Sequence, residues 1–265
     1  YLTIQAAIDA AVDGNTIEVG PGTYPETITL NKPNITVKST NGAATTIIDV
    51  PDGTLTTGVK VLANMGTVTF DGFTVRDFTE GGIIQGMSAG TGTTFHVLNN
   101  VLLPFDGYLR NGIQVSGDGS TVVGNTITSA YLTSDWASTA IGVVDASNVI
   151  VSGNTISGVG DYGISAYTWE DATMSNIQIL SNTITGIDYP LGVIAYNDGS
   201  VSNVDIHLNK VSGYEGAIEA QAYSDPEDPT YDGTSVTDVD ATHNWWGSPF
   251  GPQAPVYGEP QIIKW

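Results

Sequence analysis

Short runs of alternating apolar and polar residues recur along most of this chain in a fixed order. In each recurrence an alternation of Val, Ile and Phe leads to an asparagine, then to Thr-Ile or an equivalent pair, and then to a polar loop. The order is clearest in residues 149–158, 177–186 and 204–213. Successive asparagines are about 25 to 35 residues apart, a period typical of solenoid proteins.

The repeats are predicted to consist of strands and turns. Each contains two or three short runs rich in Val, Ile and Thr, separated by Gly, Asn, Asp and Ser. Helical repeats would need stripes at 3.6-residue spacing, rich in Ala, Leu, Glu and Lys. One coil per repeat, stacked at about 4.8 Å, predicts an all-β parallel β-helix of about nine coils and roughly 40 Å in length.

The recurrent asparagine is predicted to form a structural ladder at a bend, because asparagine tolerates left-handed backbone and can hydrogen-bond between coils. Its members are Asn100, Asn125, Asn154, Asn182, Asn209 and Asn244, with Gly72 in the first of these coils. Residues five and three before the ladder, and two after it, should form the core columns. These are Phe95, Val97, Val149, Val151, Ile177, Ile179, Val204 and Ile206, followed by Leu102, Ile127, Ile156, Ile184 and Val211.

Both ends are expected to be capped, because an open β-helix would expose strand edges and an apolar core. Residues 3–12 place Ile4, Ala7, Ile8, Ala11 and Val12 on one helical face. We expect a single domain over residues 1–265, with a helical cap at 1–15, coils at 16–244, and a C-terminal cap and final strand at 245–265. The Trp pair at 245–246 should cover the last coil.

The charge of the chain excludes some partners. Seven Lys and Arg oppose 28 Asp and Glu, giving a net charge of -21. Such a field repels nucleic acid and anionic lipid surfaces. No apolar run is long enough for a membrane-spanning helix, and there is no Cys for a disulfide or thiolate site. The start at Tyr1, without a leader, suggests a processed or excised chain, and we expect it to be extracellular.

The sequence also resembles a known superfamily. Residues 1–28, the Asn-Thr-Ile coils and the segment His-Asn-Trp-Trp-Gly-Ser-Pro-Phe-Gly-Pro at 243–252 resemble the right-handed β-helix domains of pectin-lyase-like proteins with PbH1-type repeats. They look most similar to archaeal, especially methanogen, surface-layer, sheath and adhesin-like proteins. The resemblance implies a right-handed coil. It leaves the activity open, because the superfamily includes polysaccharide lyases, glycoside hydrolases, epimerases and non-catalytic modules.

A column of acidic residues follows the ladder and could serve a glycoside hydrolase. Its members are Asp77, Asp106, Asp135, Asp161, Asp188 and Glu215. Carboxylates in adjacent coils would lie about 5 Å apart and those in alternate coils about 10 Å, which brackets the separations in retaining and inverting glycosidases. If the chain is an enzyme, the catalytic candidates are Asp135, Asp161, Asp188 and Glu215. The polygalacturonase motifs of the superfamily are absent, and a solvated acidic face is the simpler interpretation.

A polysaccharide lyase and a calcium site are further alternatives. A lyase needs a basic residue, for which Arg76 and Arg110 are the only candidates, and the negative field opposes polyuronate binding. No cofactor is required. The loop carboxylates and turn carbonyls leave Ca²⁺ open as a ligand, although no calcium-loop spacing locates a site. The three histidines lack metal-ligand spacing and are expected to be structural.

Aromatic residues beside the acidic loops are candidates for binding carbohydrate or a partner. They are Trp136, Tyr162, Tyr167, Tyr189, Tyr196 and Tyr223. Three of them follow an alanine in successive coils and should stack on one another at sheet spacing. These are Tyr167, Tyr196 and Tyr223. The longest insertion, residues 224–234, is the expected contact surface.

These features favour an extracellular structural module of the surface-layer, sheath or adhesin-like kind, which assembles with copies of itself. The alternative is a carbohydrate-active enzyme, a glycoside hydrolase or polysaccharide lyase, that acts on an extracellular polysaccharide. The sequence predicts a polysaccharide or a second copy of the chain as the partner.

Overall fold

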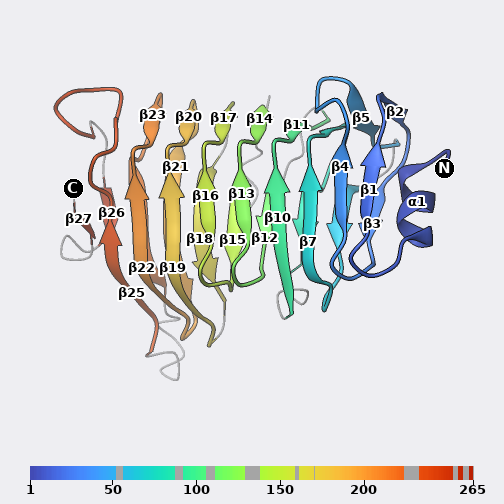
Figure 1. Ribbon diagram of the computed structural model, residues 1–265. Helices are drawn as coiled ribbons and strands as arrows, with labels where there is room; N and C mark the ends of the chain where they lie inside the picture. The colour runs from blue at the N-terminus through green and yellow to red at the C-terminus, as the bar shows by residue number, and fades with distance from the viewer. Residues whose placement is uncertain are drawn as a thin grey trace.

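The computed structural model describes residues 1–51, 56–86, 92–105, 111–128, 138–158, 161–169, 171–223, 233–252, 256–258 and 263–264. In these residues three parallel sheets wind around one core, and each strand pairs with the equivalent strand of the coil before and after it. The coils stack side by side from the N-terminal to the C-terminal end (Figure 1). The predicted all-β parallel β-helix is therefore confirmed.

The first sheet, sheet A, has ten strands. They are β1 (Thr16–Val19), β4 (Thr36–Ser39), β7 (Gly66–Asp71), β10 (Thr93–Leu98), β13 (Thr121–Val123), β16 (Ile150–Ser152), β19 (Thr173–Leu180), β22 (Ser200–His207), β25 (Ser235–Asp240) and β27 (Ile263–Lys264).

Sheet B has eight strands, most of only three residues. They are β2 (Gly22–Tyr24), β5 (Thr46–Asp49), β8 (Thr74–Arg76), β11 (Val101–Leu103), β14 (Thr126–Thr128), β17 (Thr155–Ser157), β20 (Thr183–Thr185) and β23 (Lys210–Ser212). Sheet C has nine: β3 (Ile28–Leu30), β6 (Thr57–Val61), β9 (Gly81–Gln85), β12 (Asn111–Val115), β15 (Thr139–Val144), β18 (Tyr162–Thr168), β21 (Tyr189–Tyr196), β24 (Ile218–Tyr223) and β26 (Val256–Gly258).

The number of coils differs slightly from the expected nine. Within the described residues, eight consecutive coils contribute one strand to every sheet, from β1–β3 to β22–β24. After them the chain adds β25 and β27 to sheet A and β26 to sheet C. The last turn is therefore incomplete in sheet B.

The predicted core columns are all buried and belong to one apolar cluster. They run through every coil, since equivalent residues such as Phe95 and Val68, or Ile156 and Ile184, pair in register. The alternation of inward and outward residues thus fixes the register of the strands.

The asparagines after sheet A form a continuous hydrogen-bonded ladder. In Asn125 the backbone N–H and Nδ2 both donate to Oδ1 of Asn154, at 2.9 and 3.0 Å. The same pair of bonds links each ladder asparagine to the next. The full set is Asn100, Asn125, Asn154, Asn182, Asn209 and Asn244.

The position of Gly72 in this ladder was wrong by one residue. Val97 pairs with Phe70, so the equivalent of Asn100 is Phe73, whose N–H donates to Asn100 Oδ1 at 3.0 Å. The Phe73 ring stacks on Phe70 with centroids 4.5 Å apart. Gly72, with φ 81°, belongs to the preceding position, which has positive φ in every later coil: Asn99, Gly124, Gly153, Ser181, Leu208 and His243.

A second, exposed asparagine ladder runs along sheet A, through Asn148 just before β16, Asn176 within β19 and Asn203 within β22. Asn176 donates to Asn148 at 3.0 Å, and Asn203 donates to Asn176. All three have φ between 53° and 59°, where asparagine is favoured over other non-glycine residues. This ladder was not predicted from the sequence.

The helix α1 (Ile4–Ala10) packs against β1 and β3 at the N-terminal end (Figure 1). Thr3 caps it by accepting from the N–H of Ala6. Ile4 and Ile8 are buried as expected, but Val12 lies beyond the helix and is 65% exposed. It was wrongly placed on the buried face.

At the other end only one of the two tryptophans covers the core. Trp246 is 5% exposed and joins the core cluster, and the Tyr214 hydroxyl donates to its carbonyl. Trp245 is 46% exposed. Of the final strand, Ile263–Lys264 pairs with β25, and residues 259–262 and 265 lie outside the described part.

Candidate functional site

The outer face of sheet C carries a buried polar column. Ile164, Ala166, Ile218 and Ala220 point into the core, so the residues between them point outward. One outward column runs in register through Gln114, Gly142, Ser165, Gly192 and Glu219. Although it faces away from the core, its polar members are 2 to 6% exposed, because aromatic side chains cover them.

Glu219 is held by two tyrosines. Tyr223 donates its hydroxyl to Glu219 Oε1 at 2.5 Å, and Tyr162 donates to Oε2. Tyr162 lies two coils earlier and reaches Glu219 across Gly192, where a Cβ would meet the Tyr162 ring at 3.1 Å. Glycine at 192 thus leaves room for the ring. We call Tyr162, Tyr223 and Glu219 the tyrosine clamp.

Three aromatic rings form a stack along one edge of this face. Trp169 stacks on Tyr196 with centroids 4.6 Å apart, and Tyr196 stacks on Tyr223 at 5.3 Å. The predicted stack of Tyr167, Tyr196 and Tyr223 is therefore incorrect in its first member. In sheet C, Tyr167 on β18 pairs with Ile194 on β21. The Tyr167 ring meets Trp169 edge-on, so Trp169 takes the stacked position. We call Trp169, Tyr196 and Tyr223 the aromatic stack.

The covered rings have altered acidity. Burial, followed by the charge of Asp145, raises the pKa of Tyr167 to about 12. Burial also raises the pKa values of Tyr162 and Tyr223, and the hydrogen bonds to Glu219 add to this. The pKa of Tyr196 is raised by burial and by Glu219. These phenols therefore remain protonated donors at neutral pH.

A row of carboxylates borders the start of sheet C. Asp161 and Asp188 immediately precede Tyr162 and Tyr189, which pair in register and stack at 5.6 Å. Glu215 follows in the next coil, where its N–H donates to the Asp188 carbonyl. Burial raises the pKa of Asp188, and the nearby charges of Glu215 and Asp161 raise it further. We call these three residues the acidic shelf.

Of the other predicted carboxylates, only Asp77 lies in the described part of the chain, and it is not part of the shelf. Asp77 lies at the end of sheet B and forms an ion pair with Arg76 at 3.4 Å. Asp106, Asp135 and Trp136 lie outside the described residues, as does most of the 224–234 insertion. The shelf therefore comprises three of the four predicted carboxylates that the structure describes.

The candidate lyase bases gain no support. Arg76 is engaged by Asp49 at 2.6 Å as well as by Asp77, which makes it part of a surface ion-pair cluster. Arg110 lies outside the described residues.

The histidines occupy structural positions. His96 lies on β10, where Nδ1 contacts Thr121 Oγ1 at 2.9 Å and burial lowers the pKa of the ring. His207 lies near Asp205 and Asp240, at 3.9 and 3.8 Å. In the described part of the chain, no cluster of three or more metal-ligating side chains occurs, and no helix there is long and apolar enough to cross a membrane.

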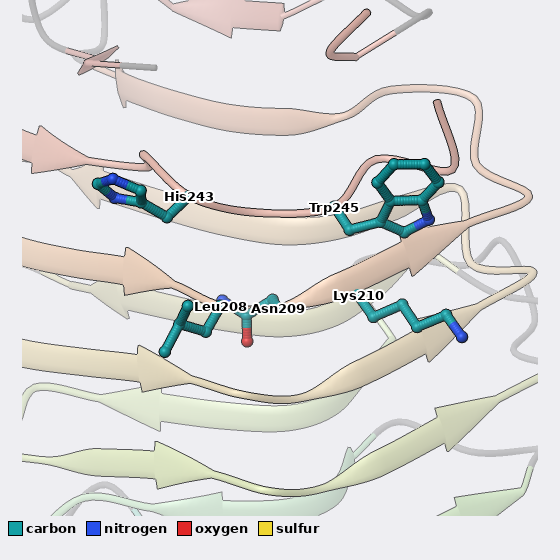
Figure 2. Close-up of a pocket in the computed structure, with 5 residues that line it drawn as sticks. All are labelled: Leu208, Asn209, Lys210, His243 and Trp245. Carbon is teal, nitrogen blue, oxygen red and sulfur yellow. The ribbon is translucent and has the colours of Figure 1, made fainter. Parts of the chain in front are cut away.

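A shallow depression of about 560 Å³ lies near the C-terminal end, lined by Leu208, Asn209, Lys210, His243 and Trp245. Figure 2 shows Leu208 and Lys210 on one coil and His243 and Trp245 on the coil that follows it. The depression lies at the corner between sheets A and B, away from the outer face of sheet C. Its lining contains no carboxylate. We regard the face of sheet C as the candidate site.

Sequence reasoning missed Glu219 and Trp169. Glu219 interrupts an apolar run, Ala217-Ile-Glu-Ala220, and a charge at an outward position of a strand is ordinarily solvated. Its signal was the pair of glycines at equivalent positions in earlier coils, Gly142 and Gly192. Such glycines indicate that another group closely approaches the strand.

Comparison with known proteins agrees with this architecture. In structure the chain is similar to the pectin methylesterase PemA from Erwinia chrysanthemi, with a TM-score of 0.51 and 12% identity over 98% of this chain and 89% of that one. It is less similar to a pectin methylesterase in complex with a hexasaccharide, with a TM-score of 0.49 and 12% identity over 98% of this chain and 90% of that one. For the mannuronan C-5 epimerase AlgE6 A-module of Azotobacter vinelandii, the TM-score is 0.40 and the identity 13%, over 98% of this chain and 92% of that one.

Identities of this order establish a shared fold and not a shared activity. A search of curated proteins gives no significant match. The family described as the right handed beta helix region matches residues 57–227. Since this match spans well over half of the sequence, the chain belongs to the right-handed β-helix family.

Proposed function

We propose that this protein binds a polysaccharide along the outer face of sheet C. The tyrosine clamp carries the proposal, because it brings the carboxylate of Glu219 and the phenols of Tyr162 and Tyr223 together at a largely covered site. Sugars offer hydroxyl groups to such donors and acceptors, and their C–H faces pack against aromatic rings. A site with aromatic walls and a few fixed polar groups is typical of ligand pockets.

The arrangement suits a polymer better than a single sugar. The clamp, the aromatic stack and the acidic shelf draw on β18, β21 and β24. The outer two of these strands are about 10 Å apart at the usual strand spacing. The repeated groups would therefore contact successive units of a chain laid along the rod. A fold similar to that of a pectin methylesterase is in line with this role.

Binding to a panel of immobilised neutral and charged glycans, measured by affinity electrophoresis and then by calorimetry, tests the proposal. We expect Trp169→Ala to weaken binding about 10-fold, or about 1.4 kcal/mol, because Trp169 is 42% exposed at the end of the aromatic stack. The matched control is Trp245→Ala, on another face, which should bind as the wild type does. If no glycan binds, or if both variants lose affinity equally, the proposal is wrong.

Catalysis on the bound polymer is the enzymatic form of this proposal. The raised pKa of Asp188 is the observation that favours it, since glycosidases keep one carboxyl protonated beside an ionised one. A glycoside hydrolase would lose its release of reducing sugar in Asp161→Asn or Asp188→Asn, and a lyase would form unsaturated product. Retained binding without either product would leave a non-catalytic binding module.

A second candidate function is assembly at the cell surface, as a surface-layer, sheath or adhesin-like module outside the cell. It is supported by exposed apolar residues near both ends of the rod, Leu2 at 98% and Phe250 at 88%. End-to-end contact between copies would bury them. Light scattering and electron microscopy of the purified chain would then show filaments or sheets, which Leu2→Ser with Phe250→Ser should disrupt. A monomer at all concentrations would contradict this candidate.

A further inference from the structure

Glu219 is a buried carboxylate without a cationic partner in the described part of the chain. It is 6% exposed, and the ion pairs of the described residues involve Lys38, Arg76 and His207 instead. Burying an ionised carboxylate without a counter-charge is costly. The two tyrosine hydroxyls offset part of this cost, but they bring no positive charge.

The acidic shelf adds three more carboxylates beside the clamp. None of these takes part in an ion pair among the described residues. Burial raises the pKa of Asp188 most, and the charges of Glu215 and Asp161 raise it further, so the three carboxylates lie close enough to repel one another. A bound cation would therefore relieve repulsion in the shelf as well as in the clamp.

Two neighbouring features are suited to a ligand that carries both an ammonium group and hydrogen-bonding groups. The stacked rings of Tyr162 and Tyr189 lie between the shelf and Glu219 in sequence and register, and aromatic faces attract ammonium groups. Ser138 is 2% exposed and its hydroxyl has no hydrogen-bond partner among the residues that the structure describes, while its N–H donates to Asp161 Oδ2 at 3.4 Å. A buried hydroxyl of this kind is normally paired.

We propose that this face selects a cationic glycan, a polymer of amino sugars with free ammonium groups, over neutral and uronic-acid polymers. The inference rests on the proposed polysaccharide binding and specifies its substrate class. In the complex the ammonium groups face Glu219 and the acidic shelf, and the sugar rings pack along the aromatic stack. The net charge of -21 attracts such a polymer over a distance and repels polyuronates.

The test compares three hexasaccharides of different charge. Calorimetry measures the binding of a glucosamine hexamer, an N-acetylglucosamine hexamer and a galacturonate hexamer to the full chain. We expect the glucosamine hexamer to bind at least about 10-fold more tightly than its neutral counterpart, and its affinity to fall with added salt, since salt screens exposed charges. The galacturonate hexamer should not bind.

Two variants locate the effect. Glu219→Gln keeps the shape and one acceptor, and should remove about 10-fold of the affinity for the glucosamine hexamer, a larger loss than for the neutral one, which does not depend on the charge. Glu18→Gln is the matched control, because it removes the same charge from an exposed position on β1, and it should change neither affinity. Circular dichroism of both variants checks that they fold.

The outcomes separate this inference from the proposed function. Equal binding of the charged and neutral hexamers, unaffected by Glu219→Gln, overturns the cationic class and leaves polysaccharide binding intact. A lysine hexapeptide that binds as tightly, with the same dependence on Glu219, shows a general cation site and also overturns the glycan class. Failure of every glycan, including the neutral panel, overturns both proposals.

Discussion

Asn154 Oδ1 accepts two hydrogen bonds from Asn125, one from the backbone N–H at 2.9 Å and one from Nδ2 at 3.0 Å. Asn154 in turn donates in the same way to Asn182 and also to the Val122 carbonyl. One side chain thus satisfies buried groups in several coils. The ladder joins the coils at a bend where regular strand pairing is interrupted.

Replacing Asn154 with alanine should therefore be costly. It leaves two donors of Asn125 without their acceptor and the Val122 carbonyl without this side-chain donor, and each buried unsatisfied group costs about 1–3 kcal/mol. We expect the free energy of unfolding in urea to fall by about 2–5 kcal/mol. Asn176→Gly, in the exposed ladder, should cost less than about 1 kcal/mol, because glycine tolerates the φ of 58° at this position and water can replace the lost bonds. Equal losses would show that burial does not determine the strength of the ladder.

Leu208 should be replaceable with a gain in stability. It has φ 60° and is 65% exposed, so it bears the cost of left-handed backbone without a buried side chain in compensation. Three of the earlier coils have asparagine or glycine at the equivalent position, namely Asn99, Gly124 and Gly153. Leu208→Asn should raise the free energy of unfolding by about 1 kcal/mol. Leu208→Ala, which keeps the strain, should give no gain, and a similar gain in both variants would argue against backbone strain.

The fold could be predicted from the sequence because each coil repeats the same physical constraints. Alternation determines which residues of 149–151 and 177–179 face the core, and the repeated asparagine marks the bend. The error at Gly72 arose because two adjacent positions, one left-handed and one a ladder position, both favour small polar residues. Phe73 breaks the ladder pattern, and only the register with Asn100 reveals it.

The candidate site was only partly predictable. Asp161, Asp188 and the tyrosines after them were identified because they recur at the repeat period. Glu219 was not, since its contact with Tyr162 spans two coils and depends on the space over Gly192. Tyr167 was misplaced because the two Ala-Tyr pairs, at 166–167 and 195–196, are out of register. Thr168 and not Ala166 pairs with Ala195, so Trp169 and not Tyr167 meets Tyr196.

Two aspartates should respond to pH in opposite ways. Arg76 lowers the pKa of Asp49, so this carboxylate stabilises the fold above its unfolded pKa of about 4 and the contribution is lost as the pH falls. The pKa of Asp188 is raised, so its ionisation destabilises the fold as the pH rises above about 4. At pH 7, Asp49→Asn should lose up to about 1 kcal/mol, and Asp188→Asn should gain up to about 0.5 kcal/mol.

Urea unfolding between about pH 3 and pH 7 measures both effects against the unfolded pKa of about 4. Asp188→Asn should approach the wild type in stability at the acid end, where this carboxyl is protonated in both states, and the loss in Asp49→Asn should shrink as the pH falls. A loss in Asp188→Asn at pH 7 would contradict the repulsion inferred for the acidic shelf.

Buried tyrosines should make the protein sensitive to alkali. The pKa of Tyr167 is raised to about 12, mainly by burial and then by Asp145, whereas a tyrosine in the unfolded chain titrates near about pH 10. The stabilising contribution of the protonated phenol is complete below about pH 10 and is lost as the pH rises towards about 12, because the unfolded chain releases its proton first. Tyr162, Tyr196 and Tyr223 act in the same direction.

Urea unfolding at intervals between about pH 10 and pH 12 should show a falling free energy of unfolding. The fall with pH should be shallower in Tyr167→Phe and unchanged in Tyr1→Phe, whose ring is 87% exposed. The same slope in all three proteins would mean that the Tyr167 phenol titrates alike in the folded and unfolded chains.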